Sequence, residues 1–240
     1  MAVFAVVPVK NLEASKRRLS TLFSPQERSL LTLAMLEDVL RALQASDLDE
    51  IVVIGSDCAI QRMADRFGVC YLEASQDGLN SALIEAAAWC MGEQADWVLV
   101  LPADIPLLRP VDVNQIIEMG VSASSVVLSP SHDGGTNALF QSTPTLVEPH
   151  FGPASFGAHI EQVHHKDSKV RFYGSLNILH DIDSAQDLKK VLEIENNTLC
   201  REALEQIISR NQAAHEYFNI IKQANPDRSG SKTQDVKKKK

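Results

Sequence analysis

A short apolar run that stops abruptly at a proline most constrains how this chain can fold. Residues Trp97–Leu101 (WVLVL) have the continuous apolar pattern of a strand buried on both faces, and Pro102 ends it. Asp104 follows, between Pro102 and a second proline at Pro106. Because prolines stop a strand and stiffen the turn after it, we expect Asp104 at the carboxyl end of this strand, where open α/β sheets bind ligands. The alternative is an ordinary Asp in a solvated turn.

Strand and helix patterns alternate on either side of this run. Helical patterns lie at 24–46, 59–67, 78–92 and 110–119, and apolar runs of strand length precede or follow them at 2–7, 50–55, 69–72 and 125–128. Such alternation is typical of a mostly parallel sheet with right-handed crossovers. Two more strands are expected at 169–173 and 176–179. The sequence therefore predicts an α/β fold, with a mostly parallel mixed sheet flanked by helices.

The chain is expected to divide into one domain and two C-terminal segments. Residues 1–197 hold the alternating pattern, and their size suits one α/β domain. Residues 198–224 read as one or two amphipathic helices that extend this domain. Residues 225–240 hold six Lys/Arg against two Asp and only one large apolar residue, so we expect a disordered basic tail.

Cationic side chains gather after the first strand. Lys10 ends the sequence PVK, and Lys16 and Arg18 follow within one loop. Residues 1–224 are acidic overall, with 17 Lys/Arg against 29 Asp/Glu, so a local cluster of cations suits an anionic ligand such as a triphosphate. The alternative is a solvated helix face. The same overall acidity makes the chain a poor general binder of nucleic acid.

Polar residues also stand where the helix over 78–92 begins. Its first turn carries Asn80 and Ser81. Asn80 either caps this helix or makes a polar contact to a nucleotide, and the residues alone leave both interpretations open.

Two further segments have the character of anion-binding sites. Asp133–Asn137 (DGGTN) is a tight turn that contains Thr136, and the backbone N–H groups of such glycine-rich turns bind anions. The alternative is a hairpin turn into a strand at 138–141. Ser155 stands where a helix over 156–163 is expected to begin, and helix N-termini bind phosphate and carboxylate groups.

Two aspartates alternate after the last expected strand. In an extended backbone Asp181 and Asp183 point the same way, and Ile182 between them turns into the core. Joined by Asp104, these carboxylates make a hard oxygen site that suits Mg²⁺ better than zinc. Asp183 is also a candidate N-cap for a helix over 185–195, and the two roles are compatible.

Histidine and cysteine offer no metal or disulfide pattern. His159, His164 and His165 lack acidic partners at metal spacing, so we interpret them as surface or core residues. The four cysteines lie far apart, without paired spacing, at Cys58, Cys70, Cys90 and Cys200. Reduced thiols of this kind, with no secretory or membrane-spanning segment in the sequence, lead us to expect a soluble cytoplasmic protein.

Six motifs carry a family resemblance. They are, in chain order, PVK with Lys16 and Arg18 downstream, LNSAL at 79–83, LPADIPLL, DGGTNAL, FGPASFGAH and LHDIDSAQDL. Over about residues 2–195 the chain resembles the 2-phospho-L-lactate guanylyltransferase family of deazaflavin (coenzyme F420) biosynthesis, which includes phosphoenolpyruvate guanylyltransferases. The resemblance implies a Rossmann-like nucleotidyltransferase fold. PVK stands where sugar-phosphate nucleotidyltransferases have a Gly-rich loop, which indicates this branch rather than a sugar substrate.

The resemblance also implies an activity and a set of roles. GMP would pass from GTP to the phosphate of 2-phospho-L-lactate or phosphoenolpyruvate, with release of pyrophosphate. The resemblance further suggests a homodimer. By similarity, the metal ligands are Asp104, Asp181 and Asp183, the catalytic residues are Asp104, Lys10 and Lys16, the nucleotide contacts are Lys10, Lys16, Arg18, Asn80 and Ser81, and the phospho-acid contacts are Thr136, Gly152 and Ser155.

Two other functions remain open at the level of sequence. One is a nucleotidyltransferase of the same fold that acts on another phosphorylated metabolite, such as 3-phosphoglycerate. The other is a non-catalytic nucleotide-binding protein, against which the presence of all three aspartates argues.

Deletion of residues 225–240 tests the interpretation of the tail. Ordering this segment would cost about 1–2 kcal/mol per residue in backbone entropy with almost no apolar burial in return. We therefore expect kcat and Tm of the truncated protein to stay nearly unchanged in steady-state assays and thermal melts. A large loss of either would show that the tail docks on the folded body.

Overall fold

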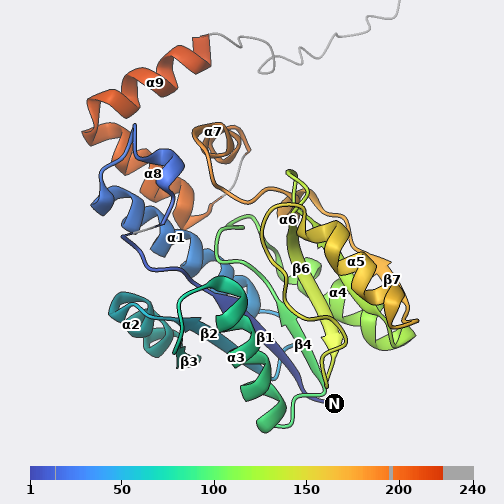
Figure 1. The fold of residues 1–240 in the computed structure, drawn as a ribbon. Helices are drawn as coiled ribbons and strands as arrows, with labels where there is room; N and C mark the ends of the chain where they lie inside the picture. Colours follow the sequence, from blue (N-terminus) through green and yellow to red (C-terminus); the bar gives the residue numbers. More distant parts are fainter. Residues whose placement is uncertain (14, 195–196, 224–240) are drawn as a thin grey trace, which may run out of the picture.

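The strands form one sheet in the part of the chain that the computed structural model describes, namely residues 1–13, 15–194 and 197–223; the predicted tail lies outside this part. The strands are β1 Val3–Pro8, β2 Glu50–Gly55, β3 Cys70–Glu73, β4 Trp97–Val100, β5 Val126–Pro130, β6 Thr136–Ser142 and β7 Val170–Phe172. Their order in this seven-stranded sheet is β3-β2-β1-β4-β6-β5-β7 (Figure 1). Neighbouring strands are parallel except at β6, which is antiparallel to β4 and β5. The predicted mixed, mostly parallel sheet is confirmed.

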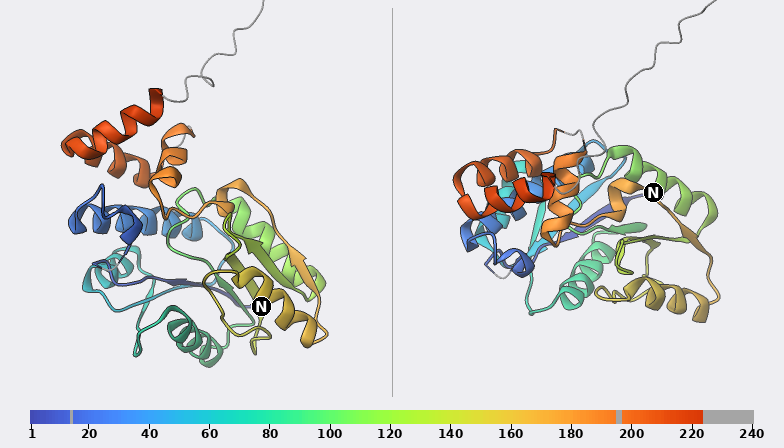
Figure 2. Two further views of the ribbon diagram at one scale, coloured as in Figure 1. Left: turned by 45° about the horizontal axis from the view of Figure 1, so that its top comes forward. Right: turned by 90° about the horizontal axis from the view of Figure 1, so that it is seen from above.

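Helices cover both faces of this sheet. They are α1 Pro25–Gln44, α2 Cys58–Phe67, α3 Leu79–Gly92, α4 Pro110–Ala123, α5 Ser155–His165, α6 Leu176–Leu179, α7 Ala185–Glu193, α8 Leu199–Arg210 and α9 Gln212–Gln223, with a short 3₁₀ turn at Arg17–Leu19. Figure 2 shows α3 and α5 on one face, with α1, α2 and α4 on the other. No helix among the described residues has the length and apolar character that crossing a membrane requires.

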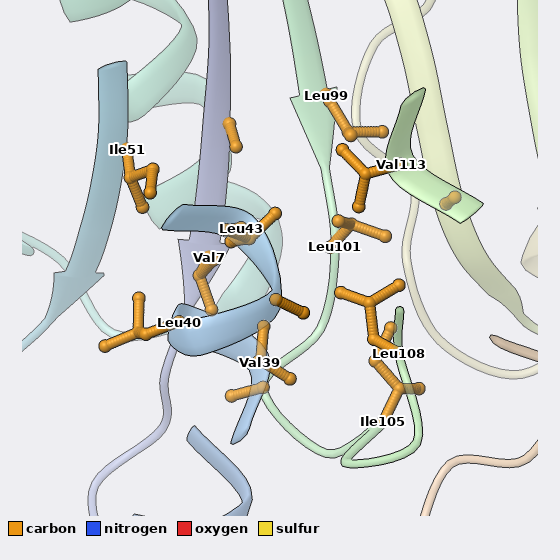
Figure 3. Close-up of a cluster of buried hydrophobic side chains, with 14 of the residues drawn as sticks. Val7, Val39, Leu40, Leu43, Ile51, Leu99, Leu101, Ile105, Leu108 and Val113 are labelled. Atoms are coloured by element: carbon orange, nitrogen blue, oxygen red, sulfur yellow. The ribbon is translucent and has the colours of Figure 1, made fainter. Parts of the chain in front are cut away.

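Alternating side chains of the strands build a core on each face. Val7 of β1 belongs to a core that includes Leu43 of α1 and Val113 of α4, whereas its neighbour Val6 belongs to a core that includes residues of α3 and α5. The first of these cores is drawn in Figure 3. Because strand residues point alternately to the two faces, a strand between two helical layers must be apolar at every position. This requirement explains the unbroken apolar runs in the sequence.

The start of α1 is fixed by a capping box and a proline. Ser24 is the N-cap, its hydroxyl accepts a hydrogen bond from the backbone N–H of Glu27, and the Glu27 carboxylate accepts from the backbone N–H of Ser24. Pro25 occupies the first helical position, where its missing N–H leaves no intrahelical bond unmade. The predicted N-terminus of this helix is confirmed.

The C-terminal helices share a third core with α1. Leu31 and Met35 of α1 are fully buried against Leu188 of α7 and Leu204 of α8, and Figure 1 shows α8 beside α1. The carboxylate of Asp38 on α1 also accepts the backbone N–H groups of Leu199 and Cys200 at 2.8 Å each, at the start of α8. The helices after residue 197 are therefore packed onto the domain rather than appended to it.

Two local predictions near the C-terminal end of the sheet are wrong. Leu176–Leu179 is the short helix α6 instead of a strand, because the Ser175 side chain caps it by accepting from the backbone N–H of Asn177. Asp183 is not the N-cap of α7. Ser184 takes that position, and the Asp187 side chain completes a capping box with it.

The Gly120→Ala substitution tests how closely α4 packs on the sheet. A Cβ atom at Gly120 would lie closer to the ring of Phe140 on β6 than van der Waals contact permits. The Phe140 ring is fully buried and stacks on Trp97 with centroids 5.0 Å apart, so it has little room to move. We expect the variant to lose about 1–3 kcal/mol of unfolding free energy in denaturant titrations.

Gly92→Ala is the matched control. Gly92 also lies in a helix, but a Cβ atom there meets nothing within 4 Å. Alanine should therefore be neutral or stabilise the protein by up to about 1 kcal/mol. Equal effects of the two substitutions would contradict the proposed tight contact at Gly120.

Candidate active site

The candidate site lies where the order of the strands changes direction. The chain moves from β1 to β2 and β3 on one side and then returns to place β4 on the other side of β1. In open α/β sheets the crevice at such a switch point, beyond the carboxyl ends of the strands, is the usual ligand site. A cavity of about 340 Å³ opens here, lined by residues that follow β1 and β4 and by others from α1, α3 and two later loops. They include Lys10, Lys16, Arg17, Arg18, Leu79, Pro102, Asp104, Phe151 and Asp183.

Lys16 lies at the centre of this cavity between two carboxylates. Its Nζ atom is 2.6 Å from Oδ2 of Asp104 and 2.8 Å from Oδ1 of Asp183, and only 6% of its side chain is exposed. Its backbone is left-handed, with φ of 48°, a conformation that side-chain-bearing residues rarely adopt. Lys16 is therefore one of the cations at the site, as predicted. The alternative interpretation, that it lies on a solvated helix face, is wrong.

The charge state of Lys16 follows from these two contacts. Burial alone would lower the pKa of the ammonium group, but the carboxylates of Asp104 and Asp183 outweigh it and raise the pKa above its ordinary value. Lys16 is thus charged at neutral pH. The remaining oxygen of Asp104, Oδ1, is buried and has no hydrogen-bond partner among the described residues.

The loop after α6 brings the other aspartates to Asp104. The backbone N–H of Ile182 donates to the backbone carbonyl of Asp104 at 2.9 Å, and the Ile182 side chain is fully buried as predicted. Asp181 and Asp183 therefore flank a residue that is fixed in the core. Burial raises the pKa of Asp181, and the nearby Asp104 carboxylate raises it further, so the three acidic groups are electrostatically coupled.

The donor set has the chemistry of a magnesium site. It consists of carboxylate oxygens, and the buried, unpartnered Oδ1 of Asp104 is an oxygen for which the fold supplies no hydrogen. Among the described residues, no three acidic, histidine or cysteine side chains already converge as a complete set of ligands. Instead, the Lys16 ammonium occupies the space between Asp104 and Asp183. Asp104, Asp181 and Asp183 fit Mg²⁺ by type, and their role as its ligands stays a prediction.

Two residues of α1 that the sequence did not reveal hold the Lys16 loop. The buried guanidinium of Arg28 donates to the backbone carbonyls of Glu13, Ser15 and Phe23 at 3.1–3.4 Å. Thr32, one turn later, hydrogen-bonds to the Ser15 hydroxyl at 3.0 Å. The signal in the sequence was a charged side chain, Arg28, among the mainly apolar buried residues of α1. The role of Arg28 did not follow from this signal, because it depends on the path of the loop that carries Lys16.

The other predicted cations lie at the rim of the cavity. The Arg18 side chain is 72% exposed, and its guanidinium lies 3.8 Å from Asp183. Lys10 is also exposed and lines both this cavity and a neighbouring one of about 240 Å³ near Gly55 and Gly78. The cations of the site therefore all come from the segment that follows β1.

Asn80 connects two sides of the cavity. Its side-chain oxygen accepts the backbone N–H of Phe151 at 2.7 Å, and its amide group donates to the Phe151 carbonyl at 3.2 Å. Gly78 is the N-cap of α3, so the alternative that Asn80 caps this helix is wrong. Ser81 follows in the same turn, and Gly152, with φ of 135°, follows Phe151. The predicted nucleotide contacts of Asn80 and Ser81 stay predictions.

Thr136 and Ser155 meet in a buried group of polar side chains. The Ser155 hydroxyl donates to Thr136 Oγ1 at 3.1 Å, and His159 Nδ1 lies 2.9 Å from the same oxygen. The turn before Thr136 joins β5 to β6, so the hairpin alternative for this segment is confirmed. Ser155 opens α5 as predicted, and His159 is a core histidine.

Asn137 is a further residue at the site that the sequence did not single out. Its amide donates to the backbone carbonyl of Ile178 at 2.8 Å and lies 3.3 Å from Oδ1 of Asp181. It therefore fixes the loop that carries Asp181 and Asp183 against the start of β6. His132, 3.3 Å from the same Asp181 oxygen, contacts this carboxylate from the β5–β6 turn.

Comparisons with known proteins agree with this geometry. Residues 3–217 match the family described as "Guanylyl transferase CofC like". The phosphoenolpyruvate guanylyltransferase of Rubrobacter xylanophilus is 38% identical over 80% of this chain and 94% of its own length. The 2-phospho-L-lactate guanylyltransferase of Methanothermobacter thermautotrophicus is 35% identical over 86% of this chain and 92% of its own.

A solved structure extends the likeness of fold. A protein of Desulfovibrio desulfuricans G20, assigned to the nucleotide-diphospho-sugar transferases, superposes with a TM-score of 0.75 over 90% of this chain and 99% of its own. At 14% identity this shows the Rossmann-like nucleotidyltransferase fold alone. The family match passes residue 195, where the resemblance of the motifs ended, and reaches into α9. The chain belongs to the guanylyl transferase CofC like family, and it is a nucleotidyltransferase.

Proposed function

We propose that this protein transfers GMP from GTP to the phosphate of a small phospho-acid, 2-phospho-L-lactate or phosphoenolpyruvate, and releases pyrophosphate. The observation that carries the proposal is the Lys16-centred group of carboxylates at the end of β4. Relatives named for these two reactions match most of the chain. The proposal places the reaction in deazaflavin (coenzyme F420) biosynthesis, in the cytoplasm, with the protein as a homodimer.

The charges of the cavity support a reaction between two polyanions. Four cationic side chains line it, against two carboxylates, and the cations lie on the segment that follows β1. A triphosphate needs such cations, both as point charges from Lys10 and Lys16 and as the planar fork of Arg18. Bringing a second phosphate next to it requires still more positive charge. Mg²⁺ held by Asp104, Asp181 and Asp183 would supply this charge when bound.

The proposed chemistry needs alignment more than proton transfer. A phosphate oxygen of the phospho-acid attacks the α-phosphorus of GTP, and the bond from that phosphorus to the oxygen leading to the β-phosphate breaks in line. The leaving pyrophosphate takes the electron pair. Because the attacking phosphate is already an anion at neutral pH, no side chain has to act as general base. The protein contributes by positioning both substrates and by compensating charge, chiefly through Lys10 and Lys16.

The phospho-acid is assigned to later segments of the chain. Thr136, Gly152 and Ser155 would bind it, close to the start of β6 and the N-terminus of α5. Asn80 and Ser81, in the first turn of α3, complete the proposed contacts to the nucleotide. Asn80 would act in part through the loop that it holds by its two hydrogen bonds to Phe151.

A substrate screen tests the proposed function. Purified protein is incubated with GTP and Mg²⁺, and pyrophosphate release is measured with 2-phospho-L-lactate, phosphoenolpyruvate or 3-phosphoglycerate. We expect release with at least one of the first two acids. Release with 3-phosphoglycerate alone would move the assignment to another phosphorylated metabolite, and the absence of release with all three would reject it.

The Asp104→Asn substitution tests the role of the central carboxylate. It keeps the shape of the side chain and leaves Lys16 paired with Asp183, so the fold should survive. We expect kcat to fall by roughly a hundredfold or more, since the charge that aligns the phosphates is lost. The control is Asp65→Asn, an exposed residue of α2, which should keep full activity. Full activity of the Asp104 variant at ordinary Mg²⁺ would falsify the assignment of this residue as a ligand.

The proposed function also predicts a preference for guanine over adenine nucleotides. By similarity to the named guanylyltransferases, GTP should be used in preference to ATP. We expect kcat/KM for GTP to exceed that for ATP by roughly tenfold or more, about 1.4 kcal/mol of transition-state discrimination. Steady-state assays with the phospho-acid held constant measure this ratio. Comparable values for the two nucleotides would rule out recognition of guanine.

A further inference from the structure

His159 is a buried histidine for which the proposed reaction has no direct use. It is fully buried, packs edge-on against the ring of Phe151, and contacts polar atoms through both ring nitrogens. The backbone N–H of His150 lies 3.1 Å from His159 Nε2, and Thr136 Oγ1 lies 2.9 Å from Nδ1. These two contacts fix which nitrogen carries the proton.

A backbone N–H can only donate, so His159 Nε2 must accept and carries no hydrogen. Burial lowers the pKa of His159 to about 4, with a further contribution from His150, and the ring is therefore neutral at physiological pH. A neutral imidazole has one N–H group, which must then be on Nδ1. His159 thus donates a hydrogen bond to Thr136 Oγ1.

Counting protons shows what this donation does to the two hydroxyl groups. His159, Thr136 and Ser155 carry three polar hydrogens between them, but only two hydrogen bonds join them. Ser155 donates to Thr136, so the Thr136 hydrogen is left over. The pair therefore retains one donor, on Thr136, without a partner among the described residues.

The position of the pair relates this spare donor to the candidate site. Val100, the last residue of β4, pairs with Leu139 of the antiparallel β6. Thr136, the first residue of β6, therefore lies beside the turn that follows β4 and carries Asp104. Ser155 lies at the first position of α5, where its backbone N–H and that of Phe156 donate to the carbonyls of Gly152 and Gly134. Thr136 is 5% exposed whereas Ser155 is not exposed at all, so of the two residues only Thr136 has exposed atoms.

We propose that His159 is a positioning residue that makes the Thr136–Ser155 hydroxyl pair a hydrogen-bond donor to an anionic oxygen of the phospho-acid. This inference rests on the proposed function and deepens it. A phosphate or carboxylate oxygen accepts and cannot donate, so it is matched by a pair that has a hydrogen to give. With the opposite tautomer, Thr136 would donate to His159 instead, and no spare hydrogen would face the substrate.

The tautomer is measured directly, without any assay of activity. Long-range ¹H–¹⁵N NMR spectra of the protein labelled with ¹⁵N-histidine distinguish a protonated Nδ1 from a protonated Nε2, and the spectrum of a His159→Asn variant identifies the signal. We expect a neutral ring with the proton on Nδ1, unchanged between pH 6 and 8. A proton on Nε2, or a charged ring in this range, would overturn the proposal.

A matched pair of variants then tests the consequence for binding. His159→Leu and His159→Asn have side chains of similar size, but only asparagine keeps a donor near the position of Nδ1. We expect KM for phosphoenolpyruvate or 2-phospho-L-lactate to rise roughly tenfold to a hundredfold in the leucine variant, while KM for GTP stays within about twofold. The asparagine variant should recover most of the affinity for the acid. Thermal melts verify that both variants fold.

The outcomes separate this inference from the proposed function. If both variants lose affinity for the acid equally, His159 has only a packing role and the inference fails, although the function stands. If the wild-type protein turns over neither acid, the proposed function fails. Calorimetric binding of phosphoenolpyruvate to the wild type and the two variants then decides the role of His159, and equal affinities would overturn it.

Discussion

The ion pairs of Lys16 with Asp104 and Asp183 connect segments that are far apart in the sequence, and the site depends on them. The ammonium lies 2.6 and 2.8 Å from carboxylates 88 and 167 residues away. A buried charge is stable only with such partners, so the loop after β1, the turn after β4 and the segment before α7 must come together. Removing Lys16 would leave both carboxylates without this cation. The contacts that define the candidate site therefore also hold its three segments in place.

Support for Lys16 extends well beyond the cavity. Arg28 and Thr32 of α1 hold the loop that carries it, and α1 is itself packed between the sheet on one side and α8 on the other. Helix α1 thus contributes to two cores at once. Of the C-terminal helices, α7 reaches the site through the Asp187 side chain, which accepts the backbone N–H of Asp183 at 3.3 Å. Helices α7 and α8 also pack against α1, on which the Lys16 loop rests. This arrangement gives a physical reason for a family match that continues into α9.

Periodicity in the sequence predicted the elements of the fold because the sheet is buried on both faces, and the prolines around Asp104 revealed its position at a strand end. The alternation of Asp181, Ile182 and Asp183 was also informative, since one buried residue fixes its neighbours. Other features were not accessible. The four residues Leu176–Leu179, three of them apolar, suit a strand or a helix equally, and the Ser175 cap decided between them. Contacts between residues distant in sequence, such as that of Thr136 with Ser155, have no local signal at all.

Because β6 runs opposite to its neighbours, the candidate site is built from two separate parts of the chain. Among the described residues, those that come before Asp104 in the sequence supply the cations and the first turn of α3, whereas the hairpin and α5 supply Thr136, Ser155 and His159. An antiparallel strand begins at the same edge of the sheet where its parallel neighbours end, so one compact segment, 131–159, reaches the site without a long crossover. In the proposed function, recognition of the nucleotide and recognition of the acid consequently fall on separate segments of the chain. Exchanging segment 131–159 between relatives would then change the acid that is bound while the nucleotide contacts are kept.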